Sequence, residues 1–160
     1  MNIRLSLFSA LLCVSVFTGC GDDDNPAGSG GDPTAALTGK NWKMTAFTVD
    51  PGFNVGGVTI TDFFAQMDAC AKDDIQNFKA NGTFTVDEGA SKCDPADPQT
   101  RTGTWVLSTD QKTITTTESG QAPESFTLES VSASQLKVSM TRSDFGDGLN
   151  HKATITFTAQ

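Results

Sequence analysis

The segment Gln135-Leu136-Lys137-Val138-Ser139-Met140-Thr141 alternates strictly between polar and apolar side chains, and this pattern decides the fold class. The segment His151-Lys152-Ala153-Thr154-Ile155-Thr156-Phe157-Thr158 repeats the alternation nearer the C-terminus. Successive side chains of a β-strand point to opposite faces, so each segment has one apolar and one polar face. We therefore expect two strands of an antiparallel sheet that is buried on one side and wet on the other.

Six further segments are rich in Thr, and residues typical of turns separate them. The complete set of expected strands is 42–49, 74–79, 83–87, 101–107, 112–118, 124–131, 135–141 and 151–158. Most connections are short, and Asn81-Gly82 is a strong hairpin signal. The sequence therefore predicts an all-β fold, an eight-stranded antiparallel up-and-down barrel, because closure removes exposed sheet edges.

One connection, residues 50–73 between the first two strands, is much longer than the others. Within it Thr61 is placed to cap a short helix over residues 62–67, with Asp62 at the positive end of the helix. We expect this segment to lie at one mouth of the barrel.

The N-terminal residues have the order of an export signal. Arg4 supplies positive charge and residues 5–17 form an apolar core, which as a helix reaches only about 20 Å of a hydrocarbon layer of about 30 Å. The run Val16-Phe17-Thr18-Gly19-Cys20 resembles the lipobox of bacterial lipoproteins. The resemblance implies that residues 1–19 are a signal peptide and that Cys20 is acylated, with palmitate or a similar chain. An ordinary secretory signal with an unmodified Cys20 is the alternative.

Residues 20–36 are rich in Gly, Pro and Asp and are expected to be a flexible tether to the barrel domain, residues 37–160. An acyl anchor would place the protein on the outer membrane. The acidic run 22–24 resembles export signals of surface lipoproteins, which implies display on the cell surface; a solvated tether is the alternative.

Charge excludes one class of partner. The chain has 11 Lys and Arg against 19 Asp and Glu, for a formal net charge of −8. Phosphate contacts need clustered basic residues, so we expect no nucleic-acid binding.

Cys70 and Cys93 remain after Cys13 in the signal and Cys20 are set aside. Exported proteins meet an oxidising compartment, so these two cysteines are expected to form a disulfide. A zinc site is the rival interpretation, but these two thiols and the single His151 fall short of a closed ligand set.

Several motifs of the C-terminal three quarters of the chain resemble the lipocalin-like domains of Bacteroidetes lipoproteins. These motifs are Leu37-Thr38-Gly39-Lys40-Asn41-Trp42, Cys70-Ala71-Lys72-Asp73-Asp74, Phe78-Lys79-Ala80-Asn81-Gly82-Thr83-Phe84, Asp87-Glu88-Gly89-Ala90-Ser91-Lys92-Cys93 and Thr102-Gly103-Thr104-Trp105. The resemblance implies a lipocalin-like barrel without enzyme activity and without a settled ligand.

Strand parity sorts the loops of such a barrel. The connection that holds Cys70 and the connection that holds Cys93 fall at the same end, away from the tether. The acidic loops gather there too. Candidate ligand-binding residues are the aromatic and Met side chains of this segment and the two tryptophans: Trp42, Phe53, Phe63, Phe64, Met67 and Trp105. Packing of these side chains as plain core is the alternative.

The expected function is therefore a membrane-anchored, lipocalin-like lipoprotein that binds a small apolar ligand at the mouth of the barrel. The alternative is a non-catalytic accessory protein with a packed barrel, which binds a protein or glycan through its acidic loops. No cofactor or metal is expected, although Asp94, Asp97, Asp144 and Asp147 could offer oxygen ligands to calcium. His151 is expected to be an exposed residue at a strand end, not a catalytic base.

Overall fold

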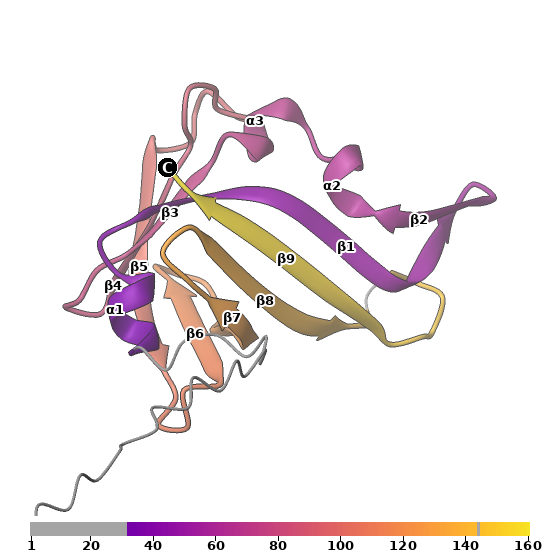
Figure 1. Ribbon diagram of the computed structural model, residues 1–160. Coiled ribbons are helices and arrows are strands. Elements are labelled where there is room, and N and C mark those ends of the chain that lie inside the picture. The colour runs from indigo at the N-terminus through magenta and orange to yellow at the C-terminus, as the bar shows by residue number, and fades with distance from the viewer. Residues whose placement is uncertain (1–31, 144) are drawn as a thin grey trace, which may run out of the picture.

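The protein folds into a closed antiparallel barrel, shown in Figure 1. The computed structural model describes residues 32–143 and 145–160, so the predicted signal peptide and Cys20 lie outside the described residues. The elements are α1 (Pro33–Leu37), β1 (Asn41–Val55), β2 (Val58–Asp62), α2 (Phe63–Gln66), α3 (Ala69–Lys72), β3 (Ile75–Phe78), β4 (Thr83–Asp87), β5 (Thr100–Leu107), β6 (Thr113–Glu118), β7 (Glu124–Val131), β8 (Gln135–Arg142) and β9 (His151–Ala159).

Strands β1 and β3 to β9 follow one another around the ring, and β1 pairs with β9 to close it. Among the described strands, β2 pairs only with the far end of β1 and lies outside the ring. The predicted eight-stranded up-and-down barrel is thus confirmed.

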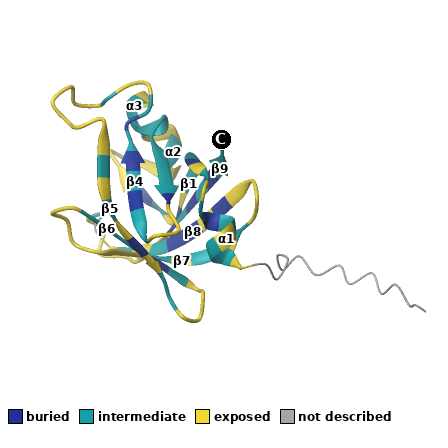
Figure 2. Ribbon diagram, turned by 90° about the vertical axis from the view of Figure 1, so that its left-hand side faces the viewer, coloured by how far each residue is buried: buried dark blue, intermediate teal, exposed yellow. Residues whose placement is uncertain are grey.

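The alternation in β8 and β9 fills the barrel interior. Leu136 lies opposite Phe157 and Val138 opposite Ile155, and all four side chains are buried. Along β9 the buried residues alternate with less buried ones, and Figure 2 shows the buried parts of the barrel strands in dark blue. Full burial of such side chains stabilises the fold by about 1.5–3 kcal/mol each. The central cluster consists of Leu37, Trp42, Phe78, Phe84, Val86, Trp105, Ile114, Leu136, Val138, Ile155 and Phe157.

The short helix α1 packs against the end of the barrel at which β1 begins. Asp32 caps it by accepting a hydrogen bond from the Thr34 amide at 2.9 Å, and Pro33 occupies its first position. Leu37 inserts into the core, and its carbonyl accepts a 2.9 Å hydrogen bond from Nε1 of Trp42. This end is therefore filled by side chains, and α1 takes in residues 33–36, which the composition assigned to the tether.

The long connection differs from its prediction. β1 continues to Val55, and Gly56 and Gly57, both with positive φ, turn the chain into β2. The expected cap Thr61 is wrong: Thr61 lies within β2, and the Asp62 carboxylate caps α2 by accepting from the Ala65 amide at 3.0 Å.

The predicted Cys70–Cys93 disulfide is confirmed. It joins α3 to the β4–β5 loop, with the two Cα atoms 5.2 Å apart. Strand parity thus places the α2–α3 segment and the β4–β5 loop at the same end of the barrel, which we call the open end. Within the described residues, no helix is long and apolar enough to cross a membrane.

Candidate functional site

The barrel interior changes from apolar to charged toward the open end. In β4 the buried alternation of Phe84 and Val86 continues to Glu88, which is only 3% exposed. In β5 the inward face that carries Trp105 continues through Gly103 to Arg101. The same two-residue repeat is maintained in the neighbouring strands. In β6 the inward-facing positions run from Ile114 to Glu118. Along β3 they run from Phe78 back to Asp74, which directly precedes the strand.

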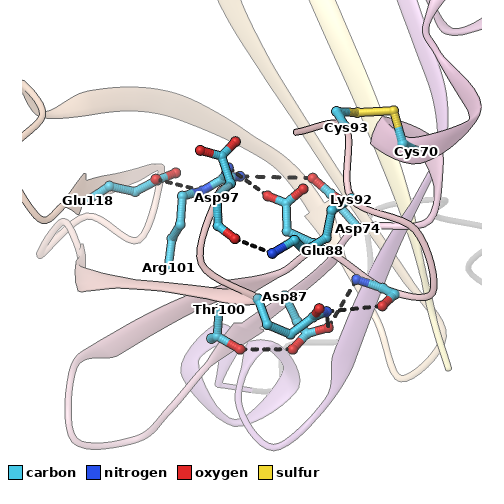
Figure 3. A network of polar contacts seen from close by, with 12 residues as sticks. Cys70, Asp74, Asp87, Glu88, Lys92, Cys93, Asp97, Thr100, Arg101 and Glu118 are labelled. Atoms are coloured by element: carbon cyan, nitrogen blue, oxygen red, sulfur yellow. Dashed lines mark hydrogen bonds and ion pairs between the residues drawn. A yellow bond between two sulfur atoms is a disulfide. The ribbon is translucent and has the colours of Figure 1, made fainter. Parts of the chain in front are cut away.

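Arg101 is the centre of this charged group, shown in Figure 3. Its Nη1 lies 2.7 Å from Oε1 of Glu88, its Nε 3.3 Å from Oε2 of Glu118, and its Nη2 3.9 Å from Oδ2 of Asp74. Three carboxylates therefore surround one guanidinium. The contacts to Glu88 and Glu118 are close ion pairs without hydrogen-bond alignment, so Glu88 Oε1 and Arg101 Nε retain buried hydrogen-bonding capacity.

The excess of negative charge alters the titration of one member. Burial and the neighbouring charge of Glu88 raise the pKa of Asp74 to about 6, although Arg101 opposes the shift. Oδ1 of Asp74 is also buried without a hydrogen-bond partner among the described residues. At neutral pH the Asp74 carboxyl is ionised, but its pKa of about 6 means that a small fall in pH would protonate it.

Two outer aspartates fix the loop that delivers Glu88. Asp73 accepts hydrogen bonds at 3.0 Å from the amides of Ala90 and Ser91 and from the Ser91 hydroxyl. Burial alone would raise the pKa of Asp73, but these hydrogen bonds together lower it. Gly89 has a positive φ, and a Cβ there would come within 2.4 Å of the Asp73 carbonyl oxygen. The loop can therefore approach α3 this closely only with glycine at position 89.

Asp87 holds the other side of the same loop. It accepts from the Thr100 hydroxyl at 2.9 Å, from the Gln99 amide group at 3.2 Å and from the Gly89 backbone amide at 3.0 Å. These hydrogen bonds lower the pKa of the Asp87 carboxyl. Together with the disulfide, they make the β4–β5 loop a fixed wall of the open end.

A pocket of about 470 Å³ lies beside Arg101 at this end. It is lined by Arg101, Thr116, Glu118, Gln121, Ala122 and Glu124, which come from β5, β6, the β6–β7 turn and β7. Thr116 and Glu124 are direct cross-strand partners, so their side chains share the inner face of the sheet. The lining offers hydroxyl, amide, carboxylate and guanidinium groups in one place.

Aromatic rings gather on the β1 and β9 side of the open end. The Phe47 and Phe63 ring centroids are 4.8 Å apart, and Phe53 stacks on Phe145 at 4.1 Å. His151 meets the Phe145 ring edge-on at 5.1 Å. We call these five residues the aromatic cluster.

The predicted ligand residues fall into three groups. Trp42 and Trp105 are buried in the core, and Nε1 of Trp105 donates to the Lys79 carbonyl at 2.9 Å. Phe53 and Phe63 belong to the aromatic cluster, whereas Phe64 lies under the Lys72 ammonium at 5.2 Å and Met67 follows α2 half-buried. None of these six residues lines the polar pocket, although Trp105 lies directly across from Thr116, which does.

The structure corrects the expectation for His151, and it leaves one of the calcium candidates outside the described residues. His151 is fully buried, so the prediction of an exposed strand-end histidine is wrong; its ring fits between Phe53, Phe145 and β1. Within the described residues, no three His, Cys, Asp or Glu side chains form a metal-binding group. Asp144, one of the four calcium candidates, lies outside the described residues.

Sequence reasoning missed the inward-facing charges. Asp74, Arg101 and Glu118 are end residues of the expected strands 74–79, 101–107 and 112–118, and Glu88 directly follows the strand 83–87, but the direction of their side chains was not considered. Extending the two-residue repeat of each strand by one step places all of them inside the barrel.

Comparison with known proteins agrees with this architecture. Residues 37–138 match the model of the lipocalin-like domain family. A solved structure of a lipocalin-like protein from Bacteroides uniformis ATCC 8492 is similar, with 14% identity, a TM-score of 0.43, and coverage of 75% of this chain and 96% of that chain. No curated protein matches the sequence. The family match spans more than half of the chain, and the chain belongs to the lipocalin-like domain family.

Proposed function

We propose that this protein is a lipid-anchored binding protein that takes a small ligand into the pocket at the open end of its barrel. The observation that carries the proposal is the pocket of about 470 Å³ beside buried polar atoms that lack hydrogen-bond partners among the described residues. Buried polar groups in native proteins are nearly always paired with protein, water or a ligand. Of these atoms only Arg101 Nε belongs to a residue that lines the pocket, and a ligand with a hydrogen-bond acceptor would satisfy it.

The chemistry of the lining refines the expected ligand. A purely apolar molecule would remove water from Arg101, Glu118 and Glu124 without offering them hydrogen bonds, which is costly even for charges that are ion-paired. The aromatic cluster at the same end offers apolar surface. We therefore propose an amphiphilic ligand, with its polar part in the pocket and its apolar part toward these rings. Binding, not catalysis, is the proposed activity.

The proposed location is the outer membrane, with the acyl chains on Cys20. Support comes from the order of basic residue, apolar core, lipobox-like run and acidic tether in the sequence. Each buried methylene adds about 0.8 kcal/mol of membrane affinity, so several chains would anchor the protein permanently. The intact mass of protein from its own host should show cleavage before Cys20 with added acyl mass, and Cys20→Ala should release the protein from the membrane fraction.

The experiment that tests ligand binding is native mass spectrometry of protein purified from its own host. We expect a bound small molecule in the wild type and its loss in Thr116→Trp, which fills the pocket. Thr104→Trp is the matched control, because Thr104 is exposed on the outer face of β5. A bare mass for the wild type, or equal retention by both variants, would contradict the proposal.

A second candidate is supported by the filled interior. Trp42, Trp105 and Ile114 occupy the barrel centre, as in a scaffold whose loops bind a macromolecule. In that case a protein or glycan partner would meet the acidic loops. Reversal of surface charges at Asp94 and Asp97 in the β4–β5 loop would then abolish capture of the partner, while Thr116→Trp would leave it intact.

A further inference from the structure

His151 lies at the junction of three segments of the open end. It begins β9, its ring contacts Phe53 of β1 and Phe145 of the β8–β9 loop, and its side chain is fully buried. Nδ1 lies 2.5 Å from the Pro51 carbonyl oxygen in β1, and Nε2 lies 3.0 Å from Oδ1 of Asp147 in the loop. The ring therefore ties the β8–β9 loop to β1.

The two partners determine the protonation state of the ring. A backbone carbonyl oxygen only accepts hydrogen bonds, and an ionised carboxylate only accepts them too. A neutral imidazole has a single N–H and can donate to one of the two, whereas the imidazolium donates to both. Protonation of Asp147 instead is disfavoured, because its Oδ1 already accepts a 3.0 Å hydrogen bond from the Leu149 amide.

We propose that His151 is an imidazolium clasp in the native protein, and that loss of its proton releases the β8–β9 loop from β1. A neutral ring would direct a lone pair at either the Pro51 carbonyl or the Asp147 carboxylate, and the repelled partner would move away. Because Phe145 stacks on Phe53 across the same junction, the loop and the aromatic cluster would loosen together.

The charges around the ring come from three elements. Asp147 of the loop favours the imidazolium. Arg142 of β8 is the direct cross-strand partner of His151 and brings a positive charge to the same face of the sheet, and it also lies 3.7 Å from Glu124. Asp50 of β1 pairs with Lys152 at the neighbouring position, so both are on the other face of the sheet from His151. The hydrogen bonds to Asp147 and Pro51 outweigh burial and raise the pKa of His151, and the same contact to His151 lowers the pKa of Asp147.

The direction of the pH effect follows. A histidine with a raised pKa in the folded state contributes stability below its ordinary pKa of about 6.5, and that contribution is lost as the pH rises through the folded value. The clasp should thus be closed below about pH 6.5 and should open as the pH rises through the raised folded pKa of His151. At the acid limit it should fail only when Asp147 is protonated.

The test uses nitrogen-15 NMR of the imidazole, which is unambiguous because the chain has one histidine. Below about pH 6.5 we expect two similar ring nitrogens, as in an imidazolium, and an apparent pKa above this value. Amide protection in residues 145–149 should fall through the same transition. Asp147→Asn should move the pKa down toward the ordinary value, because an amide can face a neutral ring.

Asp110→Asn is the matched control. Asp110 lies in the β5–β6 turn at the other end of the barrel, and its substitution should leave the histidine titration unchanged. A neutral ring below about pH 6.5, or protection of the loop that does not follow the histidine titration, would overturn the proposal. Since the wild-type measurement needs no variant, misfolding of a mutant cannot obscure the result.

Discussion

Replacing Asp74 with Asn should stabilise the protein at neutral pH. The folded pKa of Asp74 is about 6, against 3.8 for an unperturbed Asp carboxyl. Two pKa units correspond to about 3 kcal/mol. The Asp74 side chain is 23% exposed and has a distant ion pair with Arg101, so we reduce the expected effect to about 1–2 kcal/mol. Asn keeps the shape of the side chain and removes the charge.

The sign of the pH dependence makes the prediction specific. Between about pH 4 and pH 6 the folded state binds more protons at Asp74 than the unfolded state, so this residue makes stability fall as pH rises. Above pH 6 the Asp74 carboxyl is ionised in both the folded and the unfolded state. The free-energy cost of burying its charge in the folded state is then at its maximum. The advantage of Asp74→Asn should therefore be largest near pH 7.5 and should vanish near pH 4.

Urea unfolding followed by tryptophan fluorescence is a suitable assay, since both tryptophans are buried in the native barrel. The midpoint should rise at pH 7.5 with an unchanged slope. Asp110→Asn serves as a contrast, because hydrogen bonds from Ser108 and Lys112 lower the pKa of Asp110 and its loss should destabilise. If Asp74→Asn lowers stability at pH 7.5, or shifts it equally at pH 4, the described electrostatics of the open end are wrong.

Three further predictions concern the framework. Removing the disulfide by a Cys70→Ser and Cys93→Ser double substitution should cost about 3 kcal/mol, with hydrogen exchange rising first in the α2–α3 segment. Gly103→Ala should destabilise by more than about 3 kcal/mol in urea unfolding, because its Cβ would lie 2.1 Å from the Thr117 carbonyl oxygen; a variant of normal stability would refute the close strand approach. Ile114→Ala should cost about 2–5 kcal/mol by calorimetry, and a change below about 1 kcal/mol would show that the site is not packed core.

The regular part of the barrel was predictable from the sequence because β-strand periodicity acts locally. β8 and β9 follow the alternation that the sequence displays, and every observed strand end lies within one residue of the expected one, except the C-terminal end of β1. The disulfide followed from the cysteine count and the oxidising compartment that the export signal implies, and loop parity agreed with it. The hairpin of β1 and β2 was missed although Gly56-Gly57 is a typical two-residue turn, because the strand on its far side is short and exposed.

The candidate site was harder to predict because it depends on which way charged residues point. Glu88 and Arg101 continue the two-residue repeat of the inner face beyond Val86 and Gly103, but the repeat alone does not show whether a charge at a strand end is enclosed by the barrel. Their burial becomes acceptable only through the ion pair between them, which joins two strands. His151 is likewise buried among contacts with Pro51 and Asp147. Pro51 and His151 are 100 residues apart in the sequence, so their contact could not be predicted from the local sequence.

The measurement that tests the central claim most directly is a crystal structure of the mature protein purified from its own host, without additives that resemble a ligand. We expect density for a small molecule in the open-end pocket, with hydrogen bonds to Arg101 and to at least one of Glu118 and Thr116. Two results would contradict the account. One is ligand density only in the aromatic cluster; the other is a pocket that holds only ordered water in protein that still captures a protein or glycan partner.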